Sequence, residues 1–511
     1  MMNYSPHTAM ASALALILSA GAATADVTPA EVWADWQDYL SGFGFAVTAD
    51  EAPSSGALAL TNIVLTQTLP DDAGTTTVTV PGITLEDNGD GTVEIIYPDE
   101  MPIIMTGVGE NPFVMEMLYR ASDLKSTVSG DPSQILTEYT AKSVGVTVES
   151  LSSEGETVEF DEMSFDVADV VGSTNTMLEG GRTADQSIRT GPATYTVAFV
   201  DPDPDSEGKA SSMKLAGRID SLAMTGQLAM PDGADMNDMS AALNAGLSIN
   251  GDYVFGPGSS VFDIKDEDGT ATSGTSASSG GNLAIKMDES GLTYGGATND
   301  VSVETILPQL PFPVAMGIKK MAFGLTMPLT KDEEPQDFGL NLTLADFTLS
   351  DAIWALFDPT GKLPRDPANL ALDLAGKASV LVDIMDSAQM AKIEDGDAEP
   401  VQLNALTLNS LLLSLAGAEL TGQGDVAFDN DDTTVYEGMP TPVGDVAFKL
   451  TGANTLIETL VDMGLIGPEQ MMMARMGLGA FAVPGEGDDV LTSKIEFTED
   501  GGVLANGNRL K

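Results

Sequence analysis

The chain has 511 residues, of which 77 are acidic and 22 are basic, so its formal net charge is −55. A field of this sign repels anionic head groups and nucleic acid, and it excludes nucleic acid as an expected partner. The chain contains no cysteine, which excludes disulfides, thiolate chemistry and a lipid-modified cysteine.

The first 25 residues have the pattern of a cleaved signal peptide. Residues 10–20 form an apolar run, and Ala23 and Ala25 supply the small residues that a signal peptidase requires before a cut at Asp26. We therefore expect a periplasmic protein. The later apolar stretch 313–329 is interrupted by two lysines, so we expect no transmembrane segment in the mature chain.

The composition also restricts the chemistry that the mature protein can perform. His7 is the sole histidine and lies in the predicted signal peptide, so the mature chain is expected to lack both histidine and cysteine. This excludes Ser-His-Asp and Cys-His catalysis and histidine-ligated zinc. Carboxylate pairs are too numerous to indicate a glycosidase site. We expect no enzymatic activity and no cofactor.

A short amphipathic helix is predicted directly after the signal peptide. Residues 28–31 read TPAE, a capping box with proline at the first helical position, and Gly42 ends the helix. Trp33 and Trp36 lie on its apolar stripe at helical spacing. One interpretation is a helix that plugs one end of a β-core. The other is a helix that covers a ligand or touches a membrane.

Alternating apolar and polar residues predict an antiparallel meander from residue 57 onward. Turn residues such as those of the DNGDG stretch at 87–91 separate the strands. The predicted strands of this part are residues 58–69, 75–85, 92–97, 103–107, 113–120, 135–141, 144–151 and 157–167.

An acidic loop is the best candidate for a metal site. Asp201, Asp203, Asp205 and Glu207 alternate with other residues, so several carboxylates can point at a hard cation such as Ca²⁺. Two prolines and the lack of a glycine at the sixth position depart from a helical-loop calcium site. The second interpretation is a solvated hairpin tip without a metal.

A Gly/Ser/Thr tract at residues 269–281 is predicted to be a flexible loop, and it marks the internal boundary. It separates an N-terminal β-rich half, residues 26–268, from a C-terminal β-rich half, residues 282–511. The two halves are either separate cores or one continuous architecture.

The clearest strand pattern lies at residues 402–448. Leu406 and Leu408 alternate with polar residues, and the alternation continues from Leu411 to Leu415 after a one-residue slip of phase. The sequence GDVAF at residue 424 returns at residue 444, which predicts neighbouring strands built to one pattern.

Several helices are predicted in the C-terminal half. Ser350 is expected to cap a helix that carries Trp354. A helix pair follows at residues 454–465 and 468–476. Its candidate ligand-binding residues are Met472, Met473, Met476, Leu456 and Leu460. Methionine lines surfaces that accept flexible apolar ligands, but it also fills irregular cores, so both interpretations stay open.

Two segments resemble a known family. Residues 349–359 read LSDAIWALFDP, and residues 489–497 read DVLTSKIEF ahead of LANGNR at 504–509. Both are similar to the exported alphaproteobacterial proteins catalogued as domain of unknown function 2125. The resemblance covers most of the mature chain, including VWADW at 32–36. It implies an envelope protein of one elongated architecture, and it implies no activity, ligand or catalytic residue.

The fold class that we predict is mainly β: a long, strongly curved antiparallel sheet or sandwich with a few amphipathic helices. This shape is similar to the β-groove proteins that shield lipids in Gram-negative envelopes. We expect a non-enzymatic envelope protein that binds a lipid or another apolar ligand in a β-groove. The alternative is an acidic periplasmic scaffold or interaction protein with a fully packed core.

Overall fold

The computed structural model describes residues 26–68, 74–109, 111–158, 160–201, 211–234, 236, 238–383, 385, 389, 393 and 400–511. Strands make up 64% of the chain, and the pairings between neighbouring strands are antiparallel. Five helices accompany them in the described residues. The predicted mainly β, antiparallel class is therefore confirmed.

The chain divides into two compact units, Met1–Thr275 and Ser276–Lys511. The division falls inside the Gly/Ser/Thr tract, but residues 271–278 are not the flexible loop that their composition predicts. They form strand β17 (Ala271–Ser278). Small polar side chains do not prevent an extended backbone from joining a hydrogen-bonded ladder, and threonine favours a strand.

Unit 1 begins with the predicted helix, α2 (Pro29–Gly42), and its capping box is present. Thr28 Oγ1 accepts a hydrogen bond from the Glu31 backbone at 3.3 Å, and Glu31 Oε2 accepts one from the Thr28 backbone at 2.9 Å. The second helix of the unit is α3 (Met239–Asn244). The strands are β1 (Phe45–Ser54), β2 (Ala57–Thr68), β3 (Gly74–Asp87), β4 (Val93–Ile96), β5 (Glu100–Gly109), β6 (Phe113–Ser122), β7 (Lys125–Asp131), β8 (Gln134–Ser153), β9 (Glu156–Thr157), β10 (Phe160–Met177), β11 (Arg182–Thr190), β12 (Ala193–Asp201), β13 (Ser211–Ile219), β14 (Leu222–Met230), β15 (Ser248–Phe255) and β16 (Gly258–Lys265).

The sheet of unit 1 divides into two arms between β3 and β8. The first half of β3 pairs with β5 and its second half with β4. The arm through β5 and β6 reaches β8, and so does the arm through β4 and β7. Because both arms meet the same two long strands, they form a closed ring of strands, and this ring is not a barrel.

The main hydrophobic core of the described residues lies in unit 1. Leu60, Leu85 and Val93 have no exposed surface, and they belong to a cluster that also contains Val32, Trp33 and Leu40 of α2. Each large apolar side chain buried in this way stabilises the fold by about 1.5–3 kcal/mol. Helix α2 is therefore a structural part of this core, as expected for a plug.

Unit 2 is a meander in which each strand from β18 to β25 pairs with the next, β25 pairs with β27, and β28 and β29 follow. The short β26 lies beside β27. The strands are β18 (Gly280–Asp288), β19 (Gly291–Ile306), β20 (Val314–Met327), β21 (Asp332–Leu349), β22 (Ala368–Val380), β23 (Val401–Leu415), β24 (Ala418–Asp429), β25 (Thr441–Thr451), β26 (Val483–Pro484), β27 (Val490–Phe497), β28 (Val503–Ala505) and β29 (Asn508–Arg509).

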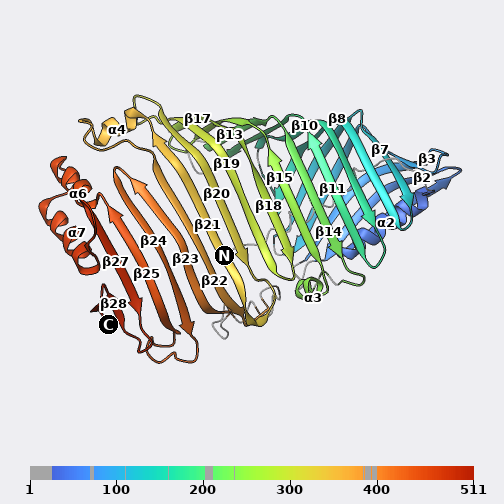
Figure 1. Cartoon of the computed structure of the whole chain (residues 1–511). Coiled ribbons are helices and arrows are strands. Elements are labelled where there is room, and N and C mark those ends of the chain that lie inside the picture. Colours follow the sequence, from blue (N-terminus) through green and yellow to red (C-terminus); the bar gives the residue numbers. More distant parts are fainter. Residues whose placement is uncertain are drawn as a thin grey trace. The chain divides into compact units, whose positions relative to one another are not determined.

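The described residues of unit 2 contain three helices, and Figure 1 shows α6 (Ala453–Asp462) and α7 (Pro468–Phe481) beside β27. The third is α4 (Asp351–Phe357). Ser350 occupies its N-cap position, but the predicted side-chain cap is wrong, because Ser350 Oγ makes no hydrogen bond. Among the described residues, none of the five helices combines the length and apolarity needed to cross a membrane.

Candidate functional site

Three rows of mainly apolar side chains cross the sheet of unit 2 from strand to strand, and we call them the apolar strip. Residues directly opposite each other on paired strands share a face of the sheet, so the register defines each row. The first row is Ile285, Tyr294, Leu325, Leu340, Leu374, Leu408, Gly424, Val446 and Ile495. The second is Leu283, Gly296, Phe323, Leu342, Leu372, Leu411, Gly422, Phe448 and Ser493. The third is Thr298, Met321, Leu344, Leu370, Leu413, Leu420, Leu450 and Leu491.

The apolar strip is not covered by a packed layer. Phe323 keeps 39% of its surface exposed, Leu342 keeps 37% and Leu413 keeps 45%. No side chain of the three rows is buried. With about 4.8 Å between strands and about 3.3 Å per residue, the strip is roughly 38 Å long and roughly 14 Å wide. An exposed apolar patch of this size, rimmed by polar residues, marks an interaction or ligand site.

The opposite face of the same sheet is polar. Asn409 donates a hydrogen bond to Asp373 at 3.0 Å, and Thr407 donates one to Asp425 at 2.8 Å. Asn341, next to Leu342 in β21, is exposed on this face. Unit 2 is thus a sheet with one solvated face and one apolar face.

A β-bulge keeps the leucines of β23 on the apolar face. Leu408 pairs with Leu374 and Ser410 pairs with Asp373, so Asn409 is an extra residue between two regular pairs. The phase slip that the sequence shows between Leu408 and Leu411 is this bulge. The prediction of neighbouring strands from the repeated GDVAF is also confirmed, since β24 and β25 pair along their whole length.

A glycine in the second row is covered by an aromatic ring. A Cβ atom at Gly422 would lie 2.7 Å from the ring of Phe448, the residue directly opposite in β25. The ring therefore fills the place of the missing side chain, and the apolar row continues across the glycine.

The structure does not place the methionines of the predicted ligand site on the apolar face of the sheet. The exposed fractions of Met472, Met473 and Met476 are 59%, 60% and 65%, and these side chains lie on the outer surface of α7. Leu456 and Leu460 of α6 are half-buried instead. A helix with methionines around most of its circumference has no single apolar stripe, so the sequence did not define which side would pack.

The N-terminus of α6 is fixed by a residue from a distant loop. Asp489 accepts hydrogen bonds from the backbone of Thr455 at 2.8 Å and from the backbone and side chain of Asn454 at 3.0 and 2.9 Å. Burial raises the pKa of this carboxyl, but the hydrogen bonds from Thr455 and Asn454 outweigh burial and lower the pKa to about 2. The Asp489 carboxylate therefore caps the helix in its charged form.

The predicted acidic metal loop lies almost entirely outside the described residues. Asp203, Asp205 and Glu207 belong to the segment that the structure does not describe, and Asp201 is described only as the last residue of β12. Within the described ranges, no cluster of acidic side chains has a geometry suited to a metal ion.

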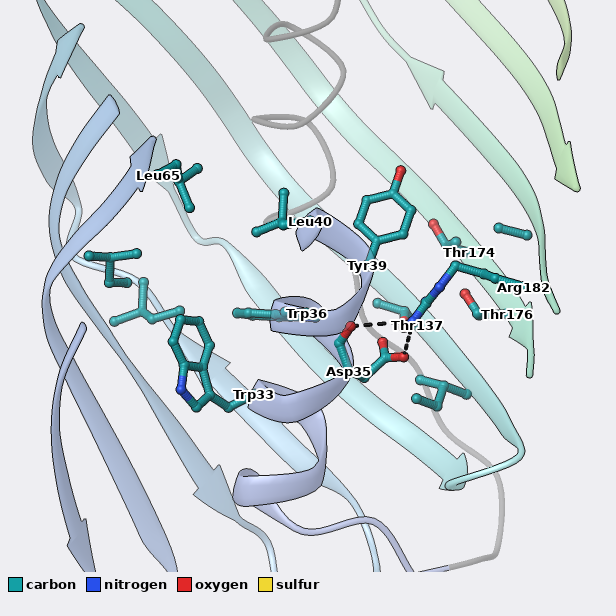
Figure 2. Close-up of a pocket in the computed structure, with 14 residues that line it drawn as sticks. Trp33, Asp35, Trp36, Tyr39, Leu40, Leu65, Thr137, Thr174, Thr176 and Arg182 are labelled. Carbon is teal, nitrogen blue, oxygen red and sulfur yellow. Dashed lines mark hydrogen bonds and ion pairs between the residues drawn. The ribbon is translucent and has the colours of Figure 1, made fainter. Parts of the chain in front are cut away.

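A second candidate site lies in unit 1, where α2 crosses the sheet without filling all the space beneath it. The gap is a cavity of about 60 Å³. Figure 2 shows Leu65 on one side of α2 and Thr137, Thr174, Thr176 and Arg182 on the other. The apolar part of the wall comes mainly from Trp36, Leu40, Ile63, Leu65, Ile83 and Ile135.

A buried ion pair joins α2 to β11 at the edge of this cavity. Arg182 Nη2 donates to Asp35 Oδ1 at 2.5 Å and to the Asp35 backbone oxygen at 3.3 Å. The Arg182 side chain is 6% exposed, and its guanidinium carbon lies 5.1 Å from the centre of the Tyr39 ring. Burial raises the pKa of Tyr39 to about 12, although the Arg182 cation opposes this shift. Tyr39 is therefore neutral at physiological pH.

Little in the sequence predicts this ion pair. Asp35 and Arg182 are 147 positions apart, and nothing local relates them. The available signal is the scarcity of basic residues, since an arginine in so acidic a chain has many carboxylates to choose from. The choice of Asp35 depends on how β11 and α2 meet in the folded unit.

A β-sheet with one polar face and one uncovered apolar face defines a class: a β-sheet protein with an open apolar surface. Within that class, the family model described as “Uncharacterized protein conserved in bacteria (DUF2125)” matches residues 254–510, and the chain belongs to this family. The match contains every strand that carries the apolar strip. No curated protein and no solved structure matches the chain.

Proposed function

We propose that this chain is an exported, non-enzymatic protein of the cell envelope that binds the acyl chains of a lipid on the apolar strip. The observation that carries the proposal is the continuity of the strip, which crosses nine strands while its side chains stay partly exposed. Burying apolar surface is favourable by roughly 25 cal/mol per Å², so an uncovered strip of this length binds an apolar ligand with a substantial driving force.

The composition of the strip favours a lipid over a protein partner. Leucine dominates the three rows, whereas protein hot spots are enriched in tryptophan, tyrosine and arginine and poor in leucine. Protein interfaces also carry about one hydrogen bond per 100–200 Å². Apart from Tyr294, the polar side chains in the rows, Thr298 and Ser493, lie at the ends, and an acyl chain needs no hydrogen bonds in between.

The charge of the chain restricts the lipid head group. A net charge of −55 repels an anionic head group at distances up to about a Debye length. We therefore propose a lipid whose head group is uncharged or zwitterionic. The export and the lack of enzymatic activity rest on the signal-peptide pattern and on a composition with one histidine and no cysteine.

The alternative is an acidic scaffold with a fully packed core. It predicts that the large apolar side chains of unit 2 are buried. The exposed fractions of Phe323 and Leu342 favour lipid binding instead.

Two neighbouring residues in β21 provide a matched test. Leu342→Lys places a charge in the second row of the strip, and Asn341→Lys places the same charge on the polar face. Because a lysine in the strip must be desolvated when an acyl chain binds, Leu342→Lys should weaken binding of an acyl-chain fluorophore at least about tenfold. Asn341→Lys should leave the affinity within about twofold.

Native mass spectrometry of the protein purified from envelopes, followed by organic extraction, should identify the bound lipid. If the parent shows neither saturable binding of the fluorophore nor an extractable lipid, the proposal is wrong. Equal weakening by the two lysine variants would also contradict it, since a general effect of charge does not depend on the face.

A further inference from the structure

The cavity beneath α2 contains a hydrogen-bonding group that the protein itself does not satisfy. Thr174 is 3% exposed and lines the cavity, and its Oγ1 atom has no hydrogen-bond partner in the described structure. A buried polar group without a partner is costly, so a cavity lined by one is suited to a ligand that supplies an acceptor.

The rest of the wall defines the other part of such a ligand. Trp36, Leu40 and Ile63 contribute apolar surface, which matches a hydrocarbon chain. A cavity of about 60 Å³ holds the carbonyl end of such a ligand rather than a whole lipid.

The charges at the cavity select between a neutral and an anionic acceptor. The Arg182 cation is already neutralised by Asp35 at 2.5 Å, and a second carboxylate, that of Asp38, lies 3.8 Å from the same nitrogen. A ligand carboxylate would meet this excess of negative charge, whereas an ester or amide carbonyl would not.

We propose that the cavity under α2 is a binding site for a neutral acyl carbonyl on an apolar chain, with Thr174 Oγ1 as its hydrogen-bond donor. The site lies in unit 1 and uses none of the residues of the apolar strip. It therefore does not depend on the function proposed for unit 2.

Tryptophan fluorescence can report on this site alone. Trp33 and Trp36 line the cavity, and the chain has three tryptophans, of which the third is Trp354 in α4. In the full-length Trp354→Phe variant, a brominated chain that enters the cavity should quench the remaining emission. The probes are methyl 4-bromobutanoate, the free 4-bromobutanoic acid and 1-bromobutane, which differ in the carbonyl and its charge and carry the bromine close to the end that enters the cavity.

We expect saturable quenching with the methyl ester, and at least about threefold weaker binding of both the acid and the bromoalkane. Thr174→Val, which removes the hydroxyl at nearly constant volume, should weaken ester binding by about three- to tenfold and leave bromoalkane binding unchanged. Thr183→Val is the matched control, because Thr183 also has a buried Oγ1 without a partner but points to the other face of β11.

Three results would overturn the proposal: no saturable quenching by the ester, equal affinity for the ester and the bromoalkane, or equal effects of Thr174→Val and Thr183→Val. Leu342→Lys separates this proposal from the one for unit 2. If the cavity site is real, quenching by the ester persists in that variant even when fluorophore binding to the strip is lost.

Discussion

At the scale of single residues, we expect loss of the ion pair between Asp35 and Arg182 to destabilise the folded state, because both side chains are largely buried. Their side chains are 12% and 6% exposed, so removal of one partner leaves the other buried without compensation. Loss of one partner of a buried ion pair typically costs about 3–5 kcal/mol. We expect Asp35→Asn to lower the free energy of unfolding by about 3 kcal/mol, measured by denaturant titration of the emission of Trp33 and Trp36.

Asp38 supplies the control for this prediction. Its carboxylate is 3.8 Å from the same arginine nitrogen, but its side chain is 85% exposed and therefore well screened by water. Asp38→Asn should cost less than about 0.5 kcal/mol. Equal losses in the two variants would show that burial of the pair is not what makes it important.

The cap that Asp489 provides for α6 makes a prediction about pH. Because hydrogen bonds from Thr455 and Asn454 hold the folded pKa of Asp489 at about 2, below its unfolded value of about 3.9, the carboxylate stabilises the folded state. This stabilisation is complete above about pH 4 and is lost as the pH falls towards 2.

Asp489→Asn tests the prediction without disturbing the local backbone, which has a positive φ of 52° that asparagine tolerates. The variant should be less stable than the parent by about 1 kcal/mol at pH 7, because hydrogen bonds to a charged acceptor are stronger. In denaturant titrations over a pH series, this difference should shrink between pH 4 and pH 2. A difference that does not depend on pH would contradict the assignment.

At the scale of elements, strand β23 shows how far a sequence pattern can be followed. The alternation of Leu406 and Leu408 with polar residues predicts the strand, and the phase slip before Leu411 coincides with the bulge that the structure shows at Asn409. Both are local signals, because side chains alternate with a period of two along any strand. The capping box of α2 is local in the same way.

Deletion of Asn409 should therefore disrupt the apolar strip. Without the extra residue, the leucines beyond the bulge turn to the polar face, because a shift of one residue inverts the direction of every side chain. We expect the deletion to abolish saturable binding of an acyl-chain fluorophore. Asn409→Ala keeps the residue count and loses only a hydrogen bond to Asp373, so it should retain binding. Full binding by the deletion variant would show that the register of β23 is not needed.

Other elements could not be placed from the sequence, because their surroundings come from distant strands. The apolar strip depends on the register of nine strands, and each register is a non-local property. Helix α7 is an example: the sequence left open whether its methionines fill a core or form a ligand-binding surface. In the structure Met472, Met473 and Met476 are exposed. Glu458 of α6 forms an ion pair with Arg475 of α7 at 2.6 Å. The residues around Thr174 in the sequence do not predict that its side chain is buried against a cavity.

The position of α7 changes what methionine substitutions should do. Since Met472 is 59% exposed and Met473 is 60% exposed, Met472→Gln or Met473→Gln should change the free energy of unfolding by less than about 0.5 kcal/mol. Neither should alter fluorophore binding to the apolar strip. Thermal melts measure the stability of these variants, and fluorophore titrations measure their binding. A loss of binding would show that α7 is part of the ligand site.

At the scale of the whole molecule, the two units differ in how far their apolar side chains are buried. In unit 1, α2 is part of the core and leaves the small cavity that Thr174 lines. In unit 2, the described residues leave the apolar strip partly exposed. Among the described residues of unit 2, the buried apolar side chains are few: Leu329, Leu363, Ala378, Val380, Val426, Ala453 and Ala505. The difference supports the proposal that the apolar strip of unit 2 binds a ligand.

The acidic charge is consistent with this use. A strip of leucines would favour aggregation in a neutral protein, but a net charge of −55 keeps copies of the chain apart. The like charge therefore favours the proposed lipid binding over association of the strip with a second copy of the chain.

Photo-cross-linking from the strip tests the central claim most directly. A benzoylphenylalanine at position 323, where Phe323 is 39% exposed on the apolar face, should form adducts of lipid mass when envelopes are irradiated, while the same group at Asn341 on the polar face should not. Mass spectrometry of the purified protein would detect them. No lipid adduct at position 323, or adducts there with protein alone, would contradict the account.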